Sequence, residues 1–287
     1  MKITLAHIIN PYKAPEGSEN AIAQPISLLS IQNAVKHKSD KYSIELYAAI
    51  IKGDEDLVPE GFKILYLNRT LTEVANFKAA RPLPLIGDII QLLLNNSTAD
   101  YFVYTNIDIG LQPYFYEKVS AEIESGYDSL VINRRGIPDQ FNSVVQMDEI
   151  YKQAGKDHPG YDCFVFKRSI AEKFIFKNIC LGIPRFERTF VLNLICFSQK
   201  THFLEKEILT FHIGETIYKT WGDQQHLQHN QSEYLKIRKE LFGSLLITKF
   251  PYWTDNVFLR YWKWIWNPNF SFPDNFLLEW RYRLKGH

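Results

Sequence analysis

The sequence is poor in cysteine. Its 287 residues include three cysteines, Cys163, Cys180 and Cys196, and each lies in an apolar stretch. An odd number of widely spaced cysteines forms neither a disulfide framework nor the paired spacing of a zinc site. We therefore expect buried free thiols and a reducing compartment.

Long hydrophobic runs are also missing. The longest uncharged apolar stretch, Thr189–Gln199, is well short of the ~18 residues that a membrane-spanning helix requires. The apolar stretch within Met1–Asn10 is too short for a signal peptide and contains His7. The sequence thus predicts a cytoplasmic protein.

Neither sign of charge is in excess, since 33 Lys and Arg stand against 32 Asp and Glu. This balance excludes a strong positive field over the whole protein, so we expect no nucleic-acid partner. The glycine-rich P-loop, the dinucleotide-binding fingerprint, the G-x-S-x-G elbow and the H-E-x-x-H helix are all missing. P-loop NTPases, dinucleotide dehydrogenases, serine hydrolases and zinc-finger proteins are therefore disfavoured.

Strand and helix patterns do alternate along the first two thirds of the chain. This alternation predicts an α/β fold with a mostly parallel central sheet and helices on both faces. In such sheets, ligands bind beyond the carboxyl ends of the strands. The predicted strands are 3–9, 43–51, 63–67, 101–105, 129–133 and 163–167, and helices are predicted from Pro25, over 89–95 and from Pro113 to Gly126.

The strand Tyr101–Thr105 ends in the sequence Asn106-Ile107-Asp108. Alternate residues of an extended chain point to the same side, so Asn106 and Asp108 can face one ligand together. Carboxylate and amide oxygens suit Mg²⁺ or Mn²⁺, and such an ion bridges phosphate oxygens. The alternative is an ordinary turn, in which Asn and Asp bond the local backbone.

A histidine, His212, follows a short apolar strand and precedes Gly214. A neutral imidazole at this point can complete a metal site that Asp108 begins. The alternative is a histidine whose hydrogen bonds are satisfied within the core.

With these two segments the chain resembles a GT-A-type glycosyltransferase. Members of that family carry a D-x-D motif at a strand end, and many have a late histidine as a third metal ligand. The resemblance spans roughly residues 1–225 and includes Arg81-Pro82-Leu83-Pro84 before the motif. The chain departs from the family at Asn106, which replaces the first Asp and removes one negative charge.

The resemblance implies a nucleoside-diphosphate-sugar donor, with Mn²⁺ or Mg²⁺ held by Asp108 and His212. It also implies a glycan or lipid-linked acceptor. Asp162, after His158-Pro159-Gly160, is expected at the mouth of the strand beside the one that carries Asn106. There it would contact the donor sugar or act as the base toward an acceptor hydroxyl. The alternative is that it caps a turn.

Glu187 is the second candidate base, and the alternative for it is an exposed ion pair with Arg185 or Arg188. Arginine presents a planar fork that matches phosphate oxygens, and one cation near the site would stabilise the departing diphosphate. For each cation the alternative is solvated surface charge. The residues expected to contact the donor are Asn10, Lys78, Arg81, Asn106, Arg134 and Arg135.

The composition changes toward the C-terminus, where five of the six tryptophans lie after residue 250. We predict a nucleotide-sugar-binding and catalytic domain over 1–225 and a helical, aromatic appendage over 226–287, packed on the core. Its mixture of aromatic and basic residues fits a peripheral site at the inner membrane face or stacking on sugar rings. Ordinary packing on the core is the alternative.

The leading hypothesis is a glycosyltransferase that moves a sugar from a nucleoside-diphosphate-sugar to a hydroxyl acceptor, as in glycan or polysaccharide synthesis. One alternative is a nucleotidyltransferase, although the segment 10–20 lacks the expected basic, glycine-rich loop. The other is a non-catalytic protein of the same fold that binds a glycan or a partner, which Asn106 and the aromatic tail favour.

Overall fold

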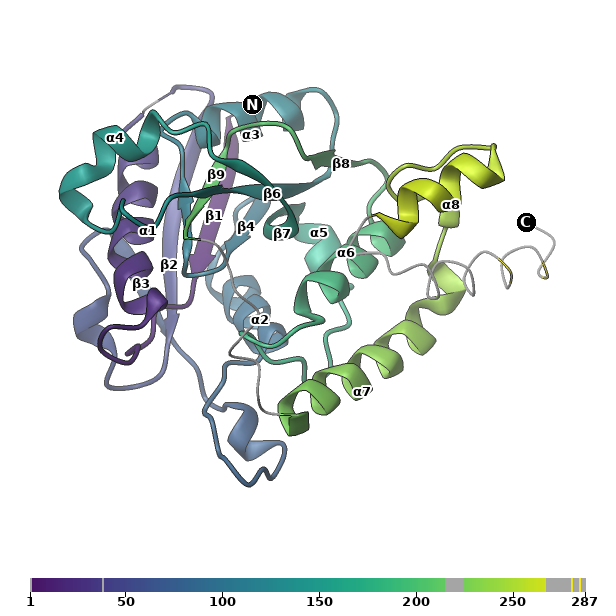
Figure 1. Ribbon diagram of the computed structural model, residues 1–287, viewed down its shortest axis with the longest axis horizontal. Helices are drawn as coiled ribbons and strands as arrows, with labels where there is room; N and C mark the ends of the chain where they lie inside the picture. Colours follow the sequence, from purple (N-terminus) through teal and green to yellow (C-terminus); the bar gives the residue numbers. More distant parts are fainter. Residues whose placement is uncertain (1, 38, 215–223, 267–279, 281–283, 285–287) are drawn as a thin grey trace.

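The computed structural model describes residues 2–37, 39–214 and 224–266, together with 280 and 284. Within these ranges one sheet of nine strands runs through the molecule (Figure 1). Its order is β3-β2-β1-β4-β7-β6-β9-β5, with β8 paired to β6. The strands are β1 Ile3–Ile9, β2 Tyr42–Ile50, β3 Phe62–Tyr66, β4 Tyr101–Thr105, β5 Ile109–Leu111, β6 Ser129–Ile137, β7 Lys156–Lys167, β8 Thr201–Leu204 and β9 Thr210–Ile213.

The N-terminal half of the sheet is parallel: β1 pairs with β2 and β4, and β2 pairs with β3. Strand β7 then runs antiparallel to both β4 and β6, whereas β8 and β9 pair in parallel with β6. Most pairings are therefore parallel. The predicted α/β fold class is confirmed, and β7 adjoins the strand that carries Asn106, as the GT-A resemblance implied.

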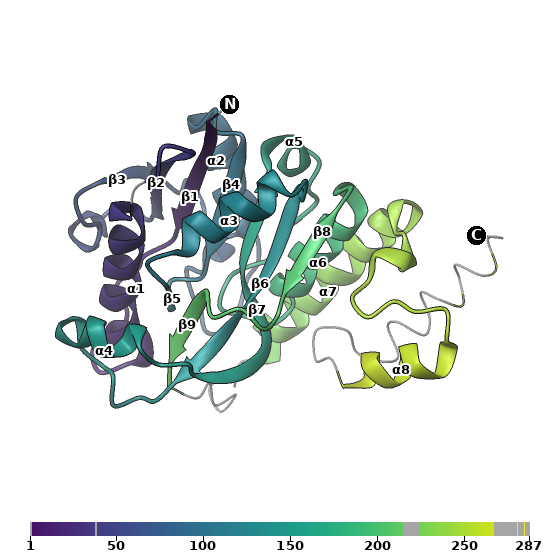
Figure 2. The same ribbon diagram turned by 90° about the horizontal axis from the view of Figure 1, so that it is seen from above.

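Helices cover both faces of the sheet, as Figures 1 and 2 show. Apolar residues of α1 and α3 pack on one face, and those of α2, α5, α6 and α7 pack on the other. The α-helices are α1 Glu19–Lys36, α2 Ile86–Asn96, α3 Phe115–Glu124, α4 Met147–Tyr151, α5 Arg168–Ala171, α6 Phe186–Phe197, α7 Gln224–Leu241 and α8 Val257–Ile265; short 3₁₀ turns occur at 55–57, 71–73, 144–146, 242–244 and 247–249.

Helix α1 begins earlier than predicted. The Ser18 side chain accepts a hydrogen bond from the backbone N–H of Ala21, which fixes the first turn. Pro25 therefore lies inside the helix rather than at its start. Its ring removes one helical N–H group, yet it sits on the exposed side of the helix, where it does not disturb the core.

Strands β6 and β7 are longer than predicted and irregular. Arg134 and Arg135 lie within β6 rather than after it, next to register shifts on either side of Asn133. Pro159 and Gly160 lie within β7, so the tight turn predicted before Asp162 is wrong. Register shifts of this kind change which side chains of β6 and β7 face each other beyond Ile132.

The C-terminal helices pack on the core. Tyr234, Ile237 and Leu241 of α7 join the main apolar cluster, as does Trp264 of α8. The proposed boundary at residue 225 stays a prediction. Among the helices described, none has the length and apolar character needed to cross a membrane.

Candidate active site

The pairing of β4 with β7 brings two of the predicted site residues together. Thr105 lies opposite Cys163, so the residues just beyond this pair meet at the edge of the sheet. The backbone N–H of Asn106 donates to the Asp162 carbonyl oxygen at 3.2 Å. Its side-chain Nδ2 donates to Asp162 Oδ1 at 2.9 Å. Asn106 thus orients the Asp162 carboxylate, an arrangement that an aspartate at position 106 could not make.

A second pairing brings His212 to Asp108. Ile109 of β5 lies opposite His212 of β9, and Asp108 directly precedes β5. His212 Nε2 is 3.3 Å from Asp108 Oδ2, with the side chains 6% and 24% exposed respectively. The neighbouring position must be glycine, because a Cβ on Gly110 would lie 2.2 Å from the Phe211 ring. The Phe211 ring lies against Gly110 because Gly110 has no side chain.

The tautomer of His212 follows from its other nitrogen. Nδ1 lies 3.2 Å from the carbonyl oxygen of Gly214. A carbonyl oxygen only accepts hydrogen bonds, so Nδ1 carries a proton. In the neutral ring, Nε2 then presents a lone pair to an oxygen of Asp108. Two facing lone pairs repel, so a positive charge is required between them: either a proton on Nε2 or a bound cation.

These residues fit the divalent cation that the family resemblance implies. Asp108 Oδ1 is buried and accepts no hydrogen bond from the part of the chain that the structure describes. One carboxylate and one imidazole suit Mn²⁺. Ions of this kind commonly take one or two protein ligands and complete their shell with water and substrate phosphates. Among the described residues, no group of three or more His, Cys, Asp or Glu side chains that could hold a metal ion occurs.

The electrostatics of Asp108 agree with this geometry. Burial by itself raises the pKa of Asp108, but the hydrogen bond and charge of His212, together with the charge of Arg134, outweigh burial. The net pKa of Asp108 is lowered, so its carboxylate is charged at neutral pH.

Arg134 and Asp162 form a buried ion pair. Arg134 Nη1 lies 3.1 Å from Asp162 Oδ2, and the two side chains are 8% and 7% exposed. Arg134 Nη2 is also 3.2 Å from His158 Nε2, while His158 Nδ1 accepts from the backbone N–H of Gly160. Burial and the Arg134 charge lower the pKa of His158 to about 4, so its ring is neutral. Asp162 is thus held from two sides, by Arg134 and Asn106.

Glu187 lies in the first turn of α6 and is half-buried. Burial and the Asp162 charge raise the pKa of Glu187 to about 8, against the opposing effects of its own backbone N–H, Arg134 and Arg188. Burial also raises the pKa of Asp162, an effect that Arg134 opposes. The two carboxyls thus differ. Asp162 is fixed in an ion pair with Arg134, whereas the pKa of Glu187, about 8, is close to neutral pH.

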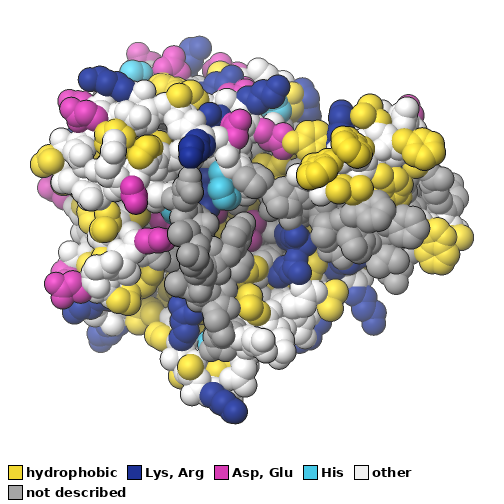
Figure 3. All heavy atoms as spheres, viewed as in Figure 1, with side chains coloured by type: hydrophobic (Ala, Val, Ile, Leu, Met, Phe, Trp, Pro, Cys, Tyr) yellow, Lys and Arg dark blue, Asp and Glu magenta, His cyan; other side chains and the backbone are white. Residues whose placement is uncertain are grey.

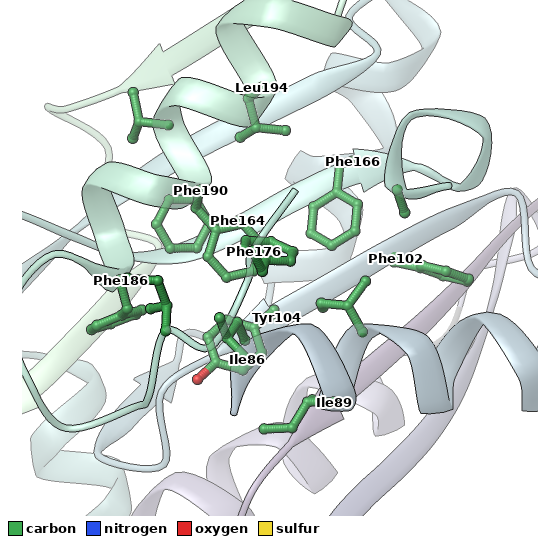
Figure 4. Packing of buried hydrophobic residues seen from close by; sticks show 14 of the residues in the cluster. Ile86, Ile89, Phe102, Tyr104, Phe164, Phe166, Phe176, Phe186, Phe190 and Leu194 are labelled. Carbon is green, nitrogen blue, oxygen red and sulfur yellow. The ribbon is translucent and has the colours of Figure 1, made fainter. Parts of the chain in front are cut away.

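The Tyr104 side chain connects the aromatic core to two of the candidate site residues, Asn10 and Asn106. Its ring stacks on Phe190 within the aromatic cluster, with ring centroids 5.3 Å apart, and its hydroxyl points away from that cluster (Figure 4). The hydroxyl donates to Asn106 Oδ1 at 3.1 Å and lies 3.4 Å from Asn10 Oδ1. Burial and the charges of three carboxylates, Asp108, Asp162 and Glu187, raise the pKa of Tyr104 well above its usual value. The negative charges of all three carboxylates therefore oppose ionisation of the Tyr104 hydroxyl.

The remaining predicted cations lie in other surroundings. Arg135 donates to the carbonyl oxygens of Ala154 and Gly155 and pairs with Asp157. Lys78 and Arg81 are exposed on the loop before α2, where the Lys78 backbone N–H donates to Gln225 of α7. Their proposed contact with a donor phosphate stays a prediction.

Sequence reasoning did not single out Tyr104 or assign a role to His158. A signal for Tyr104 was available, because Tyr104 and Asn106 are alternate residues at the end of the predicted strand. Asp108 lies in a turn, in which the Ile109 N–H donates to the Asn106 carbonyl oxygen at 3.1 Å. The contact of His158 with Arg134 depends on the irregular end of β6 and had no comparable signal.

No protein-family model matches this chain, and no curated protein matches it. Among solved structures it is similar to TarS of S. aureus, residues 1–349, in complex with UDP-GlcNAc. That pair has 10% identity and a TM-score of 0.49, over 86% of this chain and 67% of the TarS chain. The complex of the same TarS fragment with UDP has 8% identity and a TM-score of 0.47, over 86% and 66% of the respective chains. At such values, the assignment of function rests on the residues of this chain.

Proposed function

We propose that the chain is a glycosyltransferase that transfers a sugar from a nucleoside-diphosphate-sugar to an acceptor hydroxyl. The observation that carries this proposal is the pair of Asp108 and His212 at 3.3 Å, beyond the end of β4. The close approach of these two side chains, and the buried Oδ1 of Asp108 that accepts no hydrogen bond within the described residues, suit a cation that also binds phosphate oxygens. Asp108 and His212 would hold that cation, which, when bound, supplies positive charge against the departing diphosphate.

Arg134 and Asp162 are proposed to position the donor sugar. Asp162 lies beside the motif of Asn106 and Asp108, so its free lone pairs can accept hydrogen bonds from sugar hydroxyls. Arg134 holds this carboxylate in one orientation and balances its charge. Asn10, next to the Tyr104 hydroxyl, lies just beyond β1, where nucleotides bind in sheets of this type.

Glu187 is the proposed general base. In the transfer step, the acceptor oxygen forms a bond to the anomeric carbon of the sugar as the bond from that carbon to the diphosphate oxygen breaks. The acceptor proton passes to Glu187, and the nucleoside diphosphate leaves with the bonding electron pair. A pKa near 8 gives this carboxyl a strong affinity for the proton while a fraction remains ionised at neutral pH. Asp162 is the less suitable base because its charge is already paired with Arg134.

The test is thermal unfolding with UDP-, GDP-, CMP- and dTDP-sugars, each in Mn²⁺ and in EDTA. A ligand that binds only the folded state raises the midpoint. We expect one nucleotide class to raise the midpoint in Mn²⁺ and to lose most of this effect in EDTA. Asp108→Asn should remove the Mn²⁺-dependent part of the shift, because the amide is neutral and a weak ligand.

The matched control is Asp148→Asn, which makes the same change at an exposed position on α4. It should keep the full shift. Equal shifts in Asp108→Asn and the control would contradict the cation site. The lack of a shift with every sugar nucleotide, with and without Mn²⁺, would contradict the donor site and with it the transferase.

A further inference from the structure

A groove lies next to the candidate active site, between the β6–β7 end of the sheet and helix α8. Its volume is about 500 Å³, within the ~300–1,000 Å³ typical of small-molecule sites. Residues from separate parts of the chain line the groove. They include Asn133, His158, Glu205, Tyr252, Trp262 and Trp266.

Exposed aromatic rings form one wall of this groove. Trp262 lies on α8 and Trp266 directly follows the helix, with ring centroids 5.8 Å apart and ring planes inclined by 64°. They are 62% and 70% exposed, although other side chains of α8, such as Trp264, are fully buried. Figure 3 shows hydrophobic side chains gathered over α8, at the upper right of that view. Exposed aromatic rings of this kind are typical of binding surfaces.

Polar groups on the opposite wall are held in fixed positions. Both carboxylate oxygens of Glu205 accept hydrogen bonds from tyrosine hydroxyls, one from Tyr161 and one from Tyr252. Asn133 Nδ2 donates to the backbone carbonyl of Glu205 at 2.6 Å and lies 3.4 Å from that of His158. Tyr252 has a left-handed backbone, with φ of 61°. Non-glycine residues keep this conformation where surrounding contacts impose it, frequently at binding sites.

The groove leads to the catalytic residues through His158. This ring lines the groove, and its Nε2 is 3.2 Å from Arg134, the partner of Asp162. A molecule in the groove therefore contacts His158, whose ring adjoins the ion pair of Arg134 and Asp162 that is proposed to position the donor sugar.

We infer that this groove binds an oligosaccharide acceptor, stacking pyranose rings on Trp262 and Trp266 and binding their hydroxyls through Glu205. The inference rests on the proposed transferase, because it assigns the acceptor of that reaction. A pyranose ring has an apolar face and a polar rim, which match the aromatic wall and the carboxylate wall. The lining contains two acidic residues, Asp157 and Glu205, and two basic residues, Lys206 and Lys263, so the groove has no excess positive charge to select a polyanion.

The experiment measures binding of the full chain to a glycan array and, by calorimetry, to maltohexaose, cellohexaose and chitohexaose. We expect at least one oligosaccharide to bind without any donor present. Trp262→Ala and Trp266→Ala should each weaken that binding about tenfold or more, or about 1.4 kcal/mol. Glu205→Gln should weaken it too, since an amide accepts a sugar hydroxyl less strongly than a carboxylate.

The matched control is Phe258→Ala, which removes another exposed aromatic ring from α8. Phe258 is 88% exposed and lies outside the groove lining, so this variant should bind the oligosaccharide normally. Near-ultraviolet circular dichroism and the unfolding midpoint check that each variant is folded. Lack of binding to every oligosaccharide, or equal binding by the tryptophan variants and Phe258→Ala, would overturn the inference.

Two further outcomes distinguish the acceptor groove from a lipid-binding surface and from the proposed transferase activity. Binding to vesicles of phosphatidylcholine and phosphatidylglycerol without oligosaccharide binding, weakened equally by Phe258→Ala and Trp262→Ala, would assign α8 to a lipid surface and overturn the groove. Oligosaccharide binding that depends on the tryptophans, in a chain that binds no sugar nucleotide, would support the groove and refute the transferase.

Discussion

At the scale of single residues, Glu187 combines a stability cost with a proposed catalytic use. Its folded-state pKa is raised from 4.5 to about 8. For a carboxyl shifted in this direction, the folded state binds the proton more tightly than the unfolded state. Its contribution to stability is therefore complete below about pH 4.5 and is lost as the pH rises toward 8.

We expect Glu187→Gln to lose transfer activity by roughly 10²–10⁴-fold, the usual range for a general base. The same variant should be more stable than the parent chain at pH 8 and about equally stable at pH 5, because glutamine carries no charge to desolvate. Unfolding midpoints at the two pH values and the pH profile of kcat/KM measure these effects. A variant with full activity would exclude Glu187 as the base.

The control is Glu149→Gln, at an exposed position on α4. It should change neither activity nor the pH dependence of the midpoint. In the parent chain, kcat/KM should rise with pH through the Glu187 pKa, and this rise should disappear in Glu187→Gln.

The sequence singled out Asp108 and His212 as candidate residues next to short apolar strands. The structure places their side chains in contact, with His212 inside β9 rather than after it, and their role at a site stays a prediction. The ion pair of Arg134 with Asp162 was not predictable, because it depends on the register shifts around Asn133. Periodicity locates a strand, but a bulge changes which side chains face each other.

At the scale of elements, helix α7 secures the segment that leads into α6. Asn230 is fully buried, and its side chain accepts from the Cys180 N–H and donates to the carbonyl oxygens of Cys180, Ile183 and Pro184. The next residue, Gln231, accepts from Arg185 at the start of α6. These bonds fix the backbone that positions Glu187.

We expect Asn230→Ala to lower the free energy of unfolding by about 1–3 kcal/mol, since it leaves several buried backbone groups without partners. Urea denaturation measures this change. Gln228→Ala, on the exposed side of the same helix, is the matched control and should stay within about 0.5 kcal/mol of the parent. Equal stability of the two variants would contradict this role of Asn230.

Helix α1 shows why element boundaries were harder to predict than element types. Pro25 suits the first turn of a helix, which favoured a start at that residue. The Ser18 cap begins the helix earlier, and packing of Ile26 and Ile31 against the core maintains it through the proline. Tertiary burial thus outweighs the local preference of a single residue.

At the scale of the whole molecule, helices α7 and α8 contribute side chains to the same core as the sheet. Tyr234, Ile237 and Leu241, with Trp264, are buried in the main apolar cluster. Each such side chain contributes roughly 1.5–3 kcal/mol, and a whole domain is stable by only about 5–15 kcal/mol. Burial of these four side chains therefore makes a contribution comparable with the stability of a whole domain.

We expect a chain of residues 1–225 to lack a cooperative unfolding transition, because α6 loses its main packing partner. Differential scanning calorimetry measures this. A chain ending at residue 266 keeps every contact named here and should unfold cooperatively. A sharp transition in the 1–225 chain would establish that this part folds independently.

The pairing of β5 with β9 has a consequence for biosynthesis. Asp108 emerges from the ribosome long before His212, and pairing across such a separation makes folding slow. Until β9 is made, the Asp108 carboxylate has neither its imidazole partner nor the strand that shelters it. The proposed cation site therefore comes into being late in synthesis, so a nascent chain stalled before residue 212 has a nearly complete parallel half-sheet but no means of holding the ion.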